Sequence, residues 1–307
     1  MKRIGNLYEK VCSIENLQLA DEKARKGKLR TYGVIEHDKK REVNLLKLRE
    51  TLLNGTFHTS KYDVFTIYEP KEREIYRLPY FPDRILHHAI MNVLEPIWVS
   101  TFTADTYSCI KNRGIHAAAK KVKQALREDP EGTTFCLKLD IRKFYPSINH
   151  DVLKSILRRK LKDKRLLRLL DEIIDSADGV PIGNYLSQYF ANLYLTYFDH
   201  WIKEQKRVKH YFRYADDIVI LASDKSYLHS LMGEIRAYLG DLKLEVKGNW
   251  QVFPVAARGI DFVGYVFFHT HTRMRKGIKK TFCRRVGGGW ERGKYFFRYT
   301  GLSLSVG

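Results

Sequence analysis

Cysteine is scarce in this chain, and so are long apolar runs and acidic residues. Cys12, Cys109, Cys136 and Cys283 lie far apart and form no Cys-x-x-Cys pair. This spacing argues against a zinc site and against a disulfide framework. No apolar stretch is long enough to span a bilayer, and the first residues contain no apolar core of a signal peptide. We therefore expect a protein of the reducing cytoplasm that does not associate with membranes.

The shortage of acids leaves a strong positive charge. The 307 residues include 55 Lys and Arg but 35 Asp and Glu, so the net charge is +20. An excess of this size favours a polyanionic partner such as nucleic acid, with a merely soluble basic protein as the alternative. Apolar residues make up 44% of the chain and aromatic residues 13%, which excludes a disordered protein and suffices for a large core.

Helix and strand patterns alternate along the chain, with no internal repeat and no low-complexity linker, and this predicts an α+β body. Apolar spacing predicts helices through 1–60, 84–100, 117–122, 151–177 (two helices), 185–206 and 224–240. Runs of β-branched and aromatic residues predict strands at 62–68, 133–139, 242–246 and 261–268.

A Tyr-Ala-Asp-Asp tetrad stands between two apolar runs in Phe212–Ile220. This pattern predicts a β-hairpin with Asp216 and Asp217 at its tip. Because side chains alternate along a strand, one acid would face a site and the other would support it. Adjacent buried acids repel each other unless cations or donors neutralise them. For this stretch alone, a polar turn without function is the alternative.

A further acid, Asp140, ends the apolar strand that begins at Phe135. A strand, helix and hairpin in this order fit the split pattern of ferredoxin-like sheets, in which Asp140 and Asp216 would meet on neighbouring strands. Such carboxylates suit Mg²⁺, and two metal ions can activate an attacking hydroxyl and stabilise the leaving oxygen.

The block Leu137–Ile148, followed by the tetrad, resembles the palm of a reverse transcriptase. Further pieces follow in the family's order: Phe81-Pro82-Asp83-Arg84, Tyr107-Ser108-Cys109, the glycine loop before residue 185 and Phe262-Val263-Gly264-Tyr265. The resemblance implies a right-hand polymerase fold with fingers, a ferredoxin-like palm and a short thumb. The implied parts are an N-terminal extension and fingers (1–95), the first part of the palm (96–148), a fingers insertion (149–182), the second part of the palm (183–265) and a short basic thumb (266–307).

The resemblance also implies roles for the acids. Asp140 and Asp216 would ligate two Mg²⁺ ions, with Mn²⁺ as a substitute, and the Ile141 carbonyl would be a further ligand. Asp217 would be the supporting acid. A lysine would protonate the leaving pyrophosphate as a general acid. The two candidates for that lysine are Lys247 and its rival Lys243.

The segment after the first acid would hold the incoming nucleotide. The backbone at Lys143 and Phe144 would contact the triphosphate. Tyr145, at the family's steric-gate position, would stack under the sugar and clash with a 2′-hydroxyl; a packed core aromatic is the alternative. Arginine binds phosphate bidentately, so an arginine of the fingers would hold the triphosphate. The candidate bases are Arg73 with Lys71 or Arg77.

The loop from Ile182 to Gln188 narrows the resemblance. Many reverse transcriptases have Gln before its glycine, Gly183, and Pro after its serine, whereas this chain has Ile182 and Gln188. That pair is similar to the enzymes of diversity-generating retroelements, as are Lys111–His116 and Trp250–Pro254. Those enzymes copy a template-repeat RNA and misinsert opposite adenine, and the cDNA rewrites a variable repeat. Ile182 cannot hydrogen-bond the incoming nucleotide as Gln could, and this would weaken discrimination between correct and incorrect nucleotides. The alternative is that Ile182 only packs.

We therefore expect an RNA-directed DNA polymerase that binds template RNA, a primer strand and dNTPs. The resemblance also implies a small basic accessory protein as a partner, and it implies that the enzyme acts in mutagenic retrohoming. The alternatives are a group II intron or retron reverse transcriptase and, in a different class, a catalytically inactive RNA-binding scaffold. Contacts between basic side chains and the phosphate backbone of the nucleic acid would depend on salt and not on the nucleotide sequence. The bases expected to make them are Arg113, Arg273, Lys276, Lys279, Lys280 and Arg284.

Overall fold

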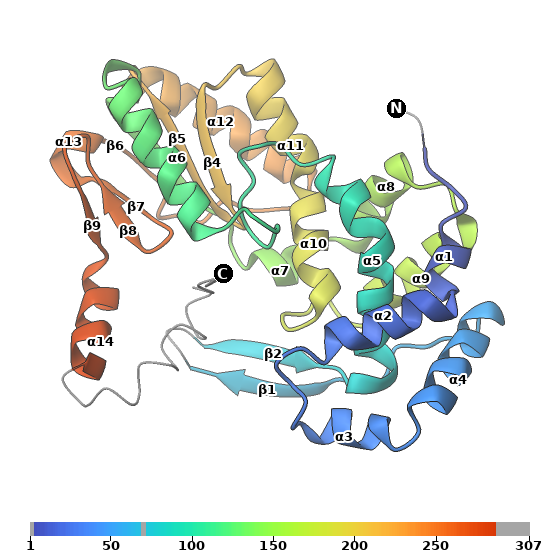
Figure 1. Cartoon of the computed structure of the whole chain (residues 1–307). Helices are drawn as coiled ribbons and strands as arrows, with labels where there is room; N and C mark the ends of the chain where they lie inside the picture. Colours follow the sequence, from blue (N-terminus) through green and yellow to red (C-terminus); the bar gives the residue numbers. More distant parts are fainter. Residues whose placement is uncertain (1–2, 69–71, 287–307) are drawn as a thin grey trace. The chain divides into compact units, whose positions relative to one another are not determined.

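The computed structural model describes residues 3–68 and 72–286, which divide into two compact units (Figure 1). The first unit comprises the chain up to Thr103, Arg142–His200 and Leu239–Glu245. The second comprises Ala104–Ile141, Trp201–Tyr238 and the chain from Val246. Both units mix helices with strands, which confirms the α+β class.

Helices make up most of the first unit. They are α1 (Tyr8–Cys12), α2 (Ile14–Ala24), α3 (Tyr32–Asp38), α4 (Arg41–Leu53), η1 (Tyr80–Arg84), α5 (Ile85–Val99), α7 (Phe144–Ser147), α8 (His150–Lys160), α9 (Lys164–Asp175), α10 (Tyr185–Tyr194) and α11 (Thr196–His200). The strands β1 (Asp63–Ile67) and β2 (Arg73–Arg77) form an antiparallel pair. Leu17, Ala20 and Ala24 recur at helical spacing on the buried side of α2, which packs against α5.

One aspartate joins two distant helix starts in this unit. Asp163 precedes α9, and its carboxylate accepts the backbone N–H of Leu166 at 3.2 Å. It also accepts the N–H groups of Leu7 and Tyr8, at 2.8 and 2.9 Å, where α1 begins. The first-turn N–H groups of a helix have no partner within the helix, so Asp163 satisfies orphan donors at both places.

The second unit is built on a sheet and a hairpin. Its helices are α6 (Ile115–Glu128), η2 (Glu131–Thr133), η3 (Trp201–Gln205), α12 (Lys225–Asp241, whose last residues belong to the first unit), α13 (Val255–Arg258) and α14 (Lys276–Val286). Its strands are β3 (Phe135–Asp140), β4 (His210–Tyr214), β5 (Asp217–Ala222), β6 (Gln251–Pro254), β7 (Ile260–Phe262), β8 (Tyr265–Phe267) and β9 (Thr272–Met274).

Four antiparallel strands form the main sheet in the order β4-β5-β3-β6, and β7-β8-β9 form a smaller sheet. Side chains alternate along β3, so Cys136 and Leu137 lie on opposite faces, and both are fully buried. Figure 1 draws α6 in front of the main sheet and α12 behind it. On the α6 side, Ala118, Val122 and Ala125 pack into one core with Cys136. Strand β3 is therefore held between two apolar layers, which fixes the position of its last residue.

Several predicted elements differ from the structure. The expected helix over 185–206 is divided into α10, α11 and η3. The hydroxyl of Thr196 donates to the carbonyl of Asn192 at 3.0 Å, and such back-bonding competes with the helix ladder. The expected strand over 242–246 is wrong, because only Val246 pairs, with Ile141. Strand β6 was not predicted.

The expected strand over 261–268 is instead the β7–β8 hairpin. Its two-residue turn is Val263-Gly264, with φ values of 44° and 89°. Positive φ at both positions is the geometry of a tight hairpin turn that matches the twist of the strands. The valine hid this turn from sequence analysis, because β-branched residues rarely adopt positive φ.

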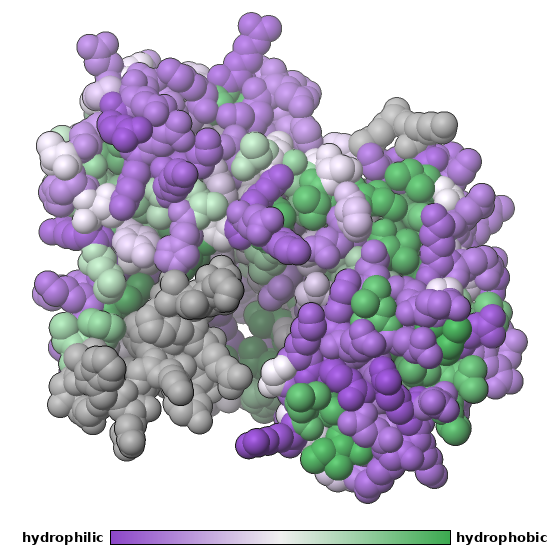
Figure 2. All heavy atoms as spheres, viewed as in Figure 1, coloured by the Kyte–Doolittle hydropathy of each residue, from purple (hydrophilic) through white to green (hydrophobic). Residues whose placement is uncertain are grey.

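Hydrophilic residues predominate on the face drawn in Figure 2, with hydrophobic residues in smaller groups. This distribution accords with the chain's charge of +20. Across the described ranges, no helix combines the length and the hydropathy needed to cross a membrane.

Candidate active site

Three carboxylates lie close together where β3 meets the β4–β5 hairpin. Asp140 is the last residue of β3 and stands opposite Asp217, the first residue of β5. Asp216 precedes it in the turn that joins β4 to β5. The structure thus places Asp140 and Asp217 on neighbouring strands of one sheet within the second unit, with Asp216 in the adjoining turn, and this arrangement follows the predicted β-α-β-β order.

The environment of Asp216 disfavours its charge. Burial is the main reason, and the adjacent Asp140 carboxyl adds to it; together they raise the pKa of Asp216 to about 7. Two carboxylates at such close range stay ionised together only when a cation offsets their repulsion. The pair is therefore suited to a positively charged ligand.

The donor set fits Mg²⁺ in an open site. In the described ranges, no group of three or more His, Cys, Asp or Glu side chains is placed to enclose a metal ion. Mg²⁺ does not need such a cage, because it commonly takes one or two carboxylates and completes its shell with water and substrate phosphates. Asp140 and Asp216 match that pattern, and residues 140 and 216 would hold the ions of a nucleotide complex.

The backbone after Asp140 leaves room for a carbonyl ligand. Ile141 forms a bridge with Val246, in which Arg142 N donates to the Glu245 carbonyl at 2.8 Å. The second bond of this bridge runs from the N–H of residue 247 to the carbonyl of residue 140 at 2.9 Å. Both bonds flank Ile141, so this bridge does not use the Ile141 carbonyl, the predicted further metal ligand.

Lys138 is a functional candidate that sequence analysis missed. Its Nζ lies 3.2 Å from Oδ1 of Asp217 and 3.3 Å from Oδ2. Burial raises the pKa of Asp217, and the Lys138 charge opposes that rise. Nζ also donates to the carbonyl of Asp261 in β7. The sequence could have indicated Lys138, because residues 138 and 140 are two apart in a strand and their side chains therefore lie on the same face of the sheet.

A buried arginine supports the hairpin tip. Ala215 has φ of 56°, a left-handed conformation that costs an alanine roughly 1 kcal/mol. The Arg213 guanidinium, which is fully buried, donates to the Ala215 carbonyl at 3.0 Å. The Arg213 N–H donates to the Asp105 carbonyl, and the Arg213 carbonyl accepts the N–H of Tyr107, at 3.0 Å each. The strained turn that presents Asp216 is thus anchored from within the unit.

Of the two candidate general acids, Lys247 lies beside the carboxylates. Its Nζ is 3.5 Å from Oδ2 of Asp140, and its side chain is 41% exposed, so it can reach a ligand in the open site. Lys243 lies in the first unit, is exposed and belongs to a turn closed by its N–H on the Gly240 carbonyl. The geometry therefore favours Lys247 for the predicted role.

The expected nucleotide-contacting segment forms a tight turn in the first unit. Lys143 has φ of 44° and immediately precedes α7, in which Phe144 is buried and Tyr145 half-buried. The Tyr145 carbonyl accepts the N–H of Val180 at 2.9 Å. Gly179 has φ of 59°, and a Cβ there would lie 2.5 Å from the carbonyl oxygen of residue 146. Only glycine permits this approach, which holds the turn in place.

The loop that contains Ile182 and Gly183 is hydrogen-bonded to β2. The Ile182 carbonyl accepts the N–H of Tyr76 at 2.8 Å. Gly183 has φ of 122°, and a Cβ there would lie 2.6 Å from the Tyr76 carbonyl oxygen. Ile182 is half-buried and Gln188 is exposed. The backbone of the loop is thus fixed to the strand that carries Arg73 and Arg77.

The three candidate triphosphate-binding bases differ in their contacts. Arg77 forms an ion pair with Asp63 on the facing strand, and its guanidinium lies 5.5 Å from the ring centroid of Phe65. Arg73 is exposed and has no ion pair within the described part of the chain. Lys71 lies outside the described residues. Of the two described candidates, Arg73 is therefore the one whose guanidinium is not already paired with a carboxylate, and it is the better candidate to bind a triphosphate.

The bases expected to contact nucleic acid lie in the second unit. Four of them are exposed on the helix α14: Lys276, Lys279, Lys280 and Arg284. Arg273 lies on β9, with its guanidinium 5.1 Å from the ring centroid of Phe268. Arg113 donates to the Thr106 carbonyl at 3.3 Å. The last part of the expected thumb, residues 287–307, lies outside the described residues.

Comparison with known proteins places the chain in a family. The profile described as "Reverse transcriptase (RNA-dependent DNA polymerase)" matches residues 69–267. The chain belongs to this family, and its activity class is RNA-directed DNA polymerase, a nucleotidyltransferase.

Relatives and solved structures agree with this assignment. The chain is 26% identical to protein YkfC of Escherichia coli over 75% of its own length and 73% of the relative's. It is 23% identical to the group II intron-encoded protein LtrA of Lactococcus lactis over 57% of its length, but spans 31% of LtrA. The structure of apo telomerase from Candida tropicalis is similar in fold, with a TM-score of 0.52 and 13% identity, over 73% of this chain and 49% of the telomerase chain. The polymerase-like fold is thereby confirmed.

Proposed function

We propose that this chain is the reverse transcriptase of a diversity-generating retroelement, which copies a template-repeat RNA into error-prone cDNA. The observation that carries the polymerase chemistry is the adjacency of Asp140 and Asp216, with Lys247 3.5 Å from Asp140. The substrates are template RNA, a primer strand and dNTPs. The Ile182 and Gln188 pair supports the retroelement subgroup.

The proposed reaction is nucleotidyl transfer. The primer 3′-hydroxyl gives its proton to solvent water and attacks the α-phosphate. A new P–O bond forms, the bond to the β-phosphate breaks, and pyrophosphate leaves with the electron pair. Two Mg²⁺ ions, when bound, supply Lewis-acid stabilisation of the attacking and leaving oxygens. Asp140 and Asp216 would hold them, with the Ile141 carbonyl as a further ligand. Asp217 stays paired with Lys138 behind them, and the Lys247 ammonium gives a proton to the pyrophosphate.

Primer extension on poly(rA)/oligo(dT) with Mg²⁺ tests the chemistry. We expect incorporation that falls about 1000-fold in Asp216→Ala, since a loss of about 4 kcal/mol of transition-state stabilisation has that effect. Replacing Mg²⁺ by Mn²⁺ should preserve activity, and removing divalent ions should abolish it. Absence of incorporation by the wild-type chain, even with its RNA and accessory protein, would favour the RNA-binding scaffold instead.

A misincorporation assay tests the subgroup. The backbone of Ile182 is held by Tyr76, so a substitution there changes the side chain without freeing the loop. Ile182→Gln adds a hydrogen-bonding group, and we expect errors opposite template adenine to fall. Ile182→Val keeps the site apolar and should leave the error rate unchanged. Equal error rates in all three proteins would contradict the proposed role.

A group II intron-type enzyme is the second candidate. It is favoured by the similarity to LtrA and by a 27% identity to nuclear intron maturase 4 of Arabidopsis thaliana over 50% of this chain. The error spectrum separates the candidates, because the retroelement proposal requires errors concentrated opposite adenine. An even, low error rate across the four template bases would favour the intron-type or retron-type enzyme.

The retroelement proposal includes a partner. Enzymes of the group it resembles act with a small, basic accessory protein that helps to bind RNA. We expect such a protein to be encoded beside this chain and to copurify with it in the presence of template RNA. Efficient copying of the template repeat by the chain alone would contradict this part of the proposal.

A further inference from the structure

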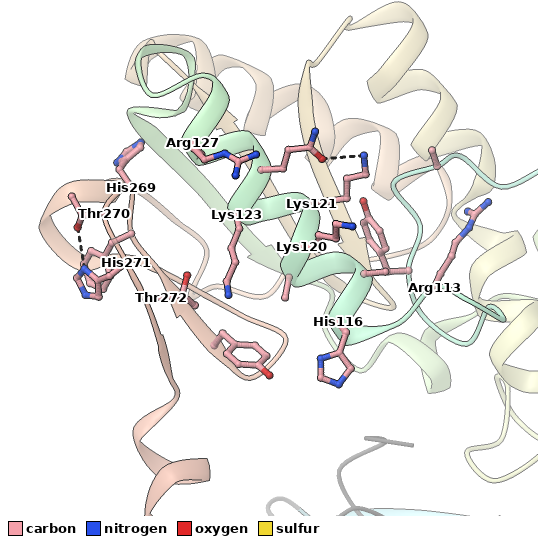
Figure 3. Close-up of a pocket in the computed structure, with 17 residues that line it drawn as sticks. Arg113, His116, Lys120, Lys121, Lys123, Arg127, His269, Thr270, His271 and Thr272 are labelled. Carbon is pink, nitrogen blue, oxygen red and sulfur yellow. Dashed lines mark hydrogen bonds between the residues drawn. The ribbon is translucent and has the colours of Figure 1, made fainter. Parts of the chain in front are cut away.

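A basic groove lies on the second unit between α6 and the strands β8 and β9 (Figure 3). Its volume is about 1040 Å³. Five Lys and Arg side chains line it, and none of its lining residues, all of them described, is an Asp or Glu. The groove contains neither the catalytic acids nor Lys247. No part of the mechanism above uses it. The lining bases are Arg113, Lys120, Lys121, Lys123 and Arg127.

The helix α6 presents its lysine, arginine and histidine side chains as a stripe. His116, Lys120, Lys123 and Arg127 recur at intervals of four, three and four residues, so they share one face of the helix. The apolar residues of α6 face the sheet instead. All four stripe residues are exposed. From His116 to Arg127 the helix rises about 16 Å, the axial length of about five phosphates of one strand at 3.4 Å each.

The opposite wall adds aromatic surface. The rings of Phe268 and His271 are stacked, with centroids 4.6 Å apart and planes 12° apart. Thr270 and His271 are hydrogen-bonded at 3.0 Å, which orients the imidazole, and Figure 3 shows this pair on the hairpin side of the groove. An exposed, oriented ring beside a row of cations is the combination that binds single-stranded nucleic acid, because phosphates pair with the cations and bases stack on the ring.

We propose that this groove binds a single-stranded segment of RNA outside the polymerase centre. The lack of acids in its lining opposes a basic protein, and the aromatic wall distinguishes it from a plain phosphate-binding surface. The inference deepens the proposed function, since the choice of RNA rests on the template that the enzyme copies. The groove would retain part of the RNA while another part occupies the active site.

The test is binding of a fluorescein-labelled, mixed-sequence single-stranded RNA to the full chain without dNTPs, across about 50 to 200 mM salt. The groove variant carries Lys120→Gln, Lys123→Gln and Arg127→Gln. The matched control, Lys47→Gln with Lys164→Gln and Arg168→Gln, removes the same charge from exposed residues of α4 and α9.

Removing three phosphate contacts should reduce the slope of log K against log salt by about 2, since each contributes about 0.7 on a single strand. Over a fourfold change in salt, wild-type affinity would then fall about 16-fold more than that of the groove variant. The control should keep the wild-type slope. His271→Ala should weaken binding without changing the slope, because it removes a stacking surface and not a permanent charge.

Two results would overturn the inference: a wild-type slope and affinity in the groove variant, or an equal loss in the control. If the groove variant binds RNA normally but loses binding to an acidic protein, the groove is a protein-docking surface and the proposal is wrong. Extension of poly(rA)/oligo(dT) separates this test from the proposed function. Normal RNA binding by the groove variant, with intact extension by the wild-type chain, refutes the groove alone. A changed slope in the groove variant, with no extension by the wild-type chain even when its RNA and accessory protein are present, supports the groove and refutes the polymerase.

Discussion

The contact between Lys138 and Asp217 leads to the most informative prediction. Asp217 stands opposite Asp140, and its carboxylate would add a third negative charge to Asp140 and Asp216, the pair proposed to hold the metal ions. Lys138 lies 3.2 Å from that carboxylate, and the two side chains are 26% and 30% exposed. Lys138→Met keeps the length of the side chain and removes the charge. We expect it to leave Asp217 as an uncompensated anion beside the metal ligands.

The size of the effect follows from the geometry. Two unit charges 3.2 Å apart attract each other by about 5 kcal/mol at an effective dielectric constant of 20. Desolvation of both partners and their partial exposure offset much of this attraction, so about 1–3 kcal/mol remains. If this loss falls on the transition state, kcat decreases about 5- to 160-fold. The extra anion should also tighten apparent Mg²⁺ binding, so kcat and the Mg²⁺ half-saturation should fall together.

Steady-state primer extension, titrated with Mg²⁺, measures both quantities. Lys138→Arg retains the charge and should recover most of kcat. Asp217→Asn in the Lys138→Met background removes the unpaired anion and should also recover activity, so the two substitutions should not be additive. Thermal unfolding of each variant controls for misfolding. Wild-type kcat in Lys138→Met, or strictly additive losses in the double variant, would refute the reasoning.

Three further predictions follow from the structure. Gly179→Ala places a Cβ 2.5 Å from a backbone oxygen at positive φ and should destabilise the protein by about 2 kcal/mol. Gly233→Ala, on the open side of α12, should stabilise the protein by about 0.5–1 kcal/mol. Denaturant unfolding measures both changes. Asp21 is buried, and although burial alone would raise its pKa, the His37 imidazole 3.5 Å away and hydrogen bonds from Tyr80 and two arginines hold that pKa below its usual range. The stabilisation from this carboxylate is therefore present above about pH 4 and is lost as pH falls. Asp21→Asn should cost about 3 kcal/mol at pH 7 and progressively less below pH 4 in urea titrations. Tyr145→Ala should lower the ratio of dNTP to rNTP incorporation at least about tenfold, and an unchanged ratio would mean that Tyr145 only packs.

Local patterns predicted most elements correctly, and the failures have physical causes. Amphipathic spacing located α5, α8, α9 and α12, because each presents an apolar face at helical period. The β7–β8 turn was missed because it places Val263 at positive φ, which tertiary packing enforces against local preference. Strand β6 was missed because its four residues become a strand only by pairing with β3.

The chemistry was readable before the fold. An acid at the end of an apolar strand and two more in a turn are local features, and their order along the chain resembles a polymerase palm. Sequence alone therefore determined the class of reaction and the α+β architecture, and it selected Asp140, Asp216 and Asp217 as the candidate acids of the site.

Tertiary structure decided which distant side chains act on those acids. Lys138 faces Asp217, and Lys247 rather than Lys243 lies beside the carboxylates. The backbone of Arg213, at the base of the strained tip, bonds to Asp105 and Tyr107. The basic groove depends in the same way on the β8–β9 strands lying across from α6. These relations join residues tens of positions apart through sheet register and packing, and spacing along a chain carries no information about register between distant strands.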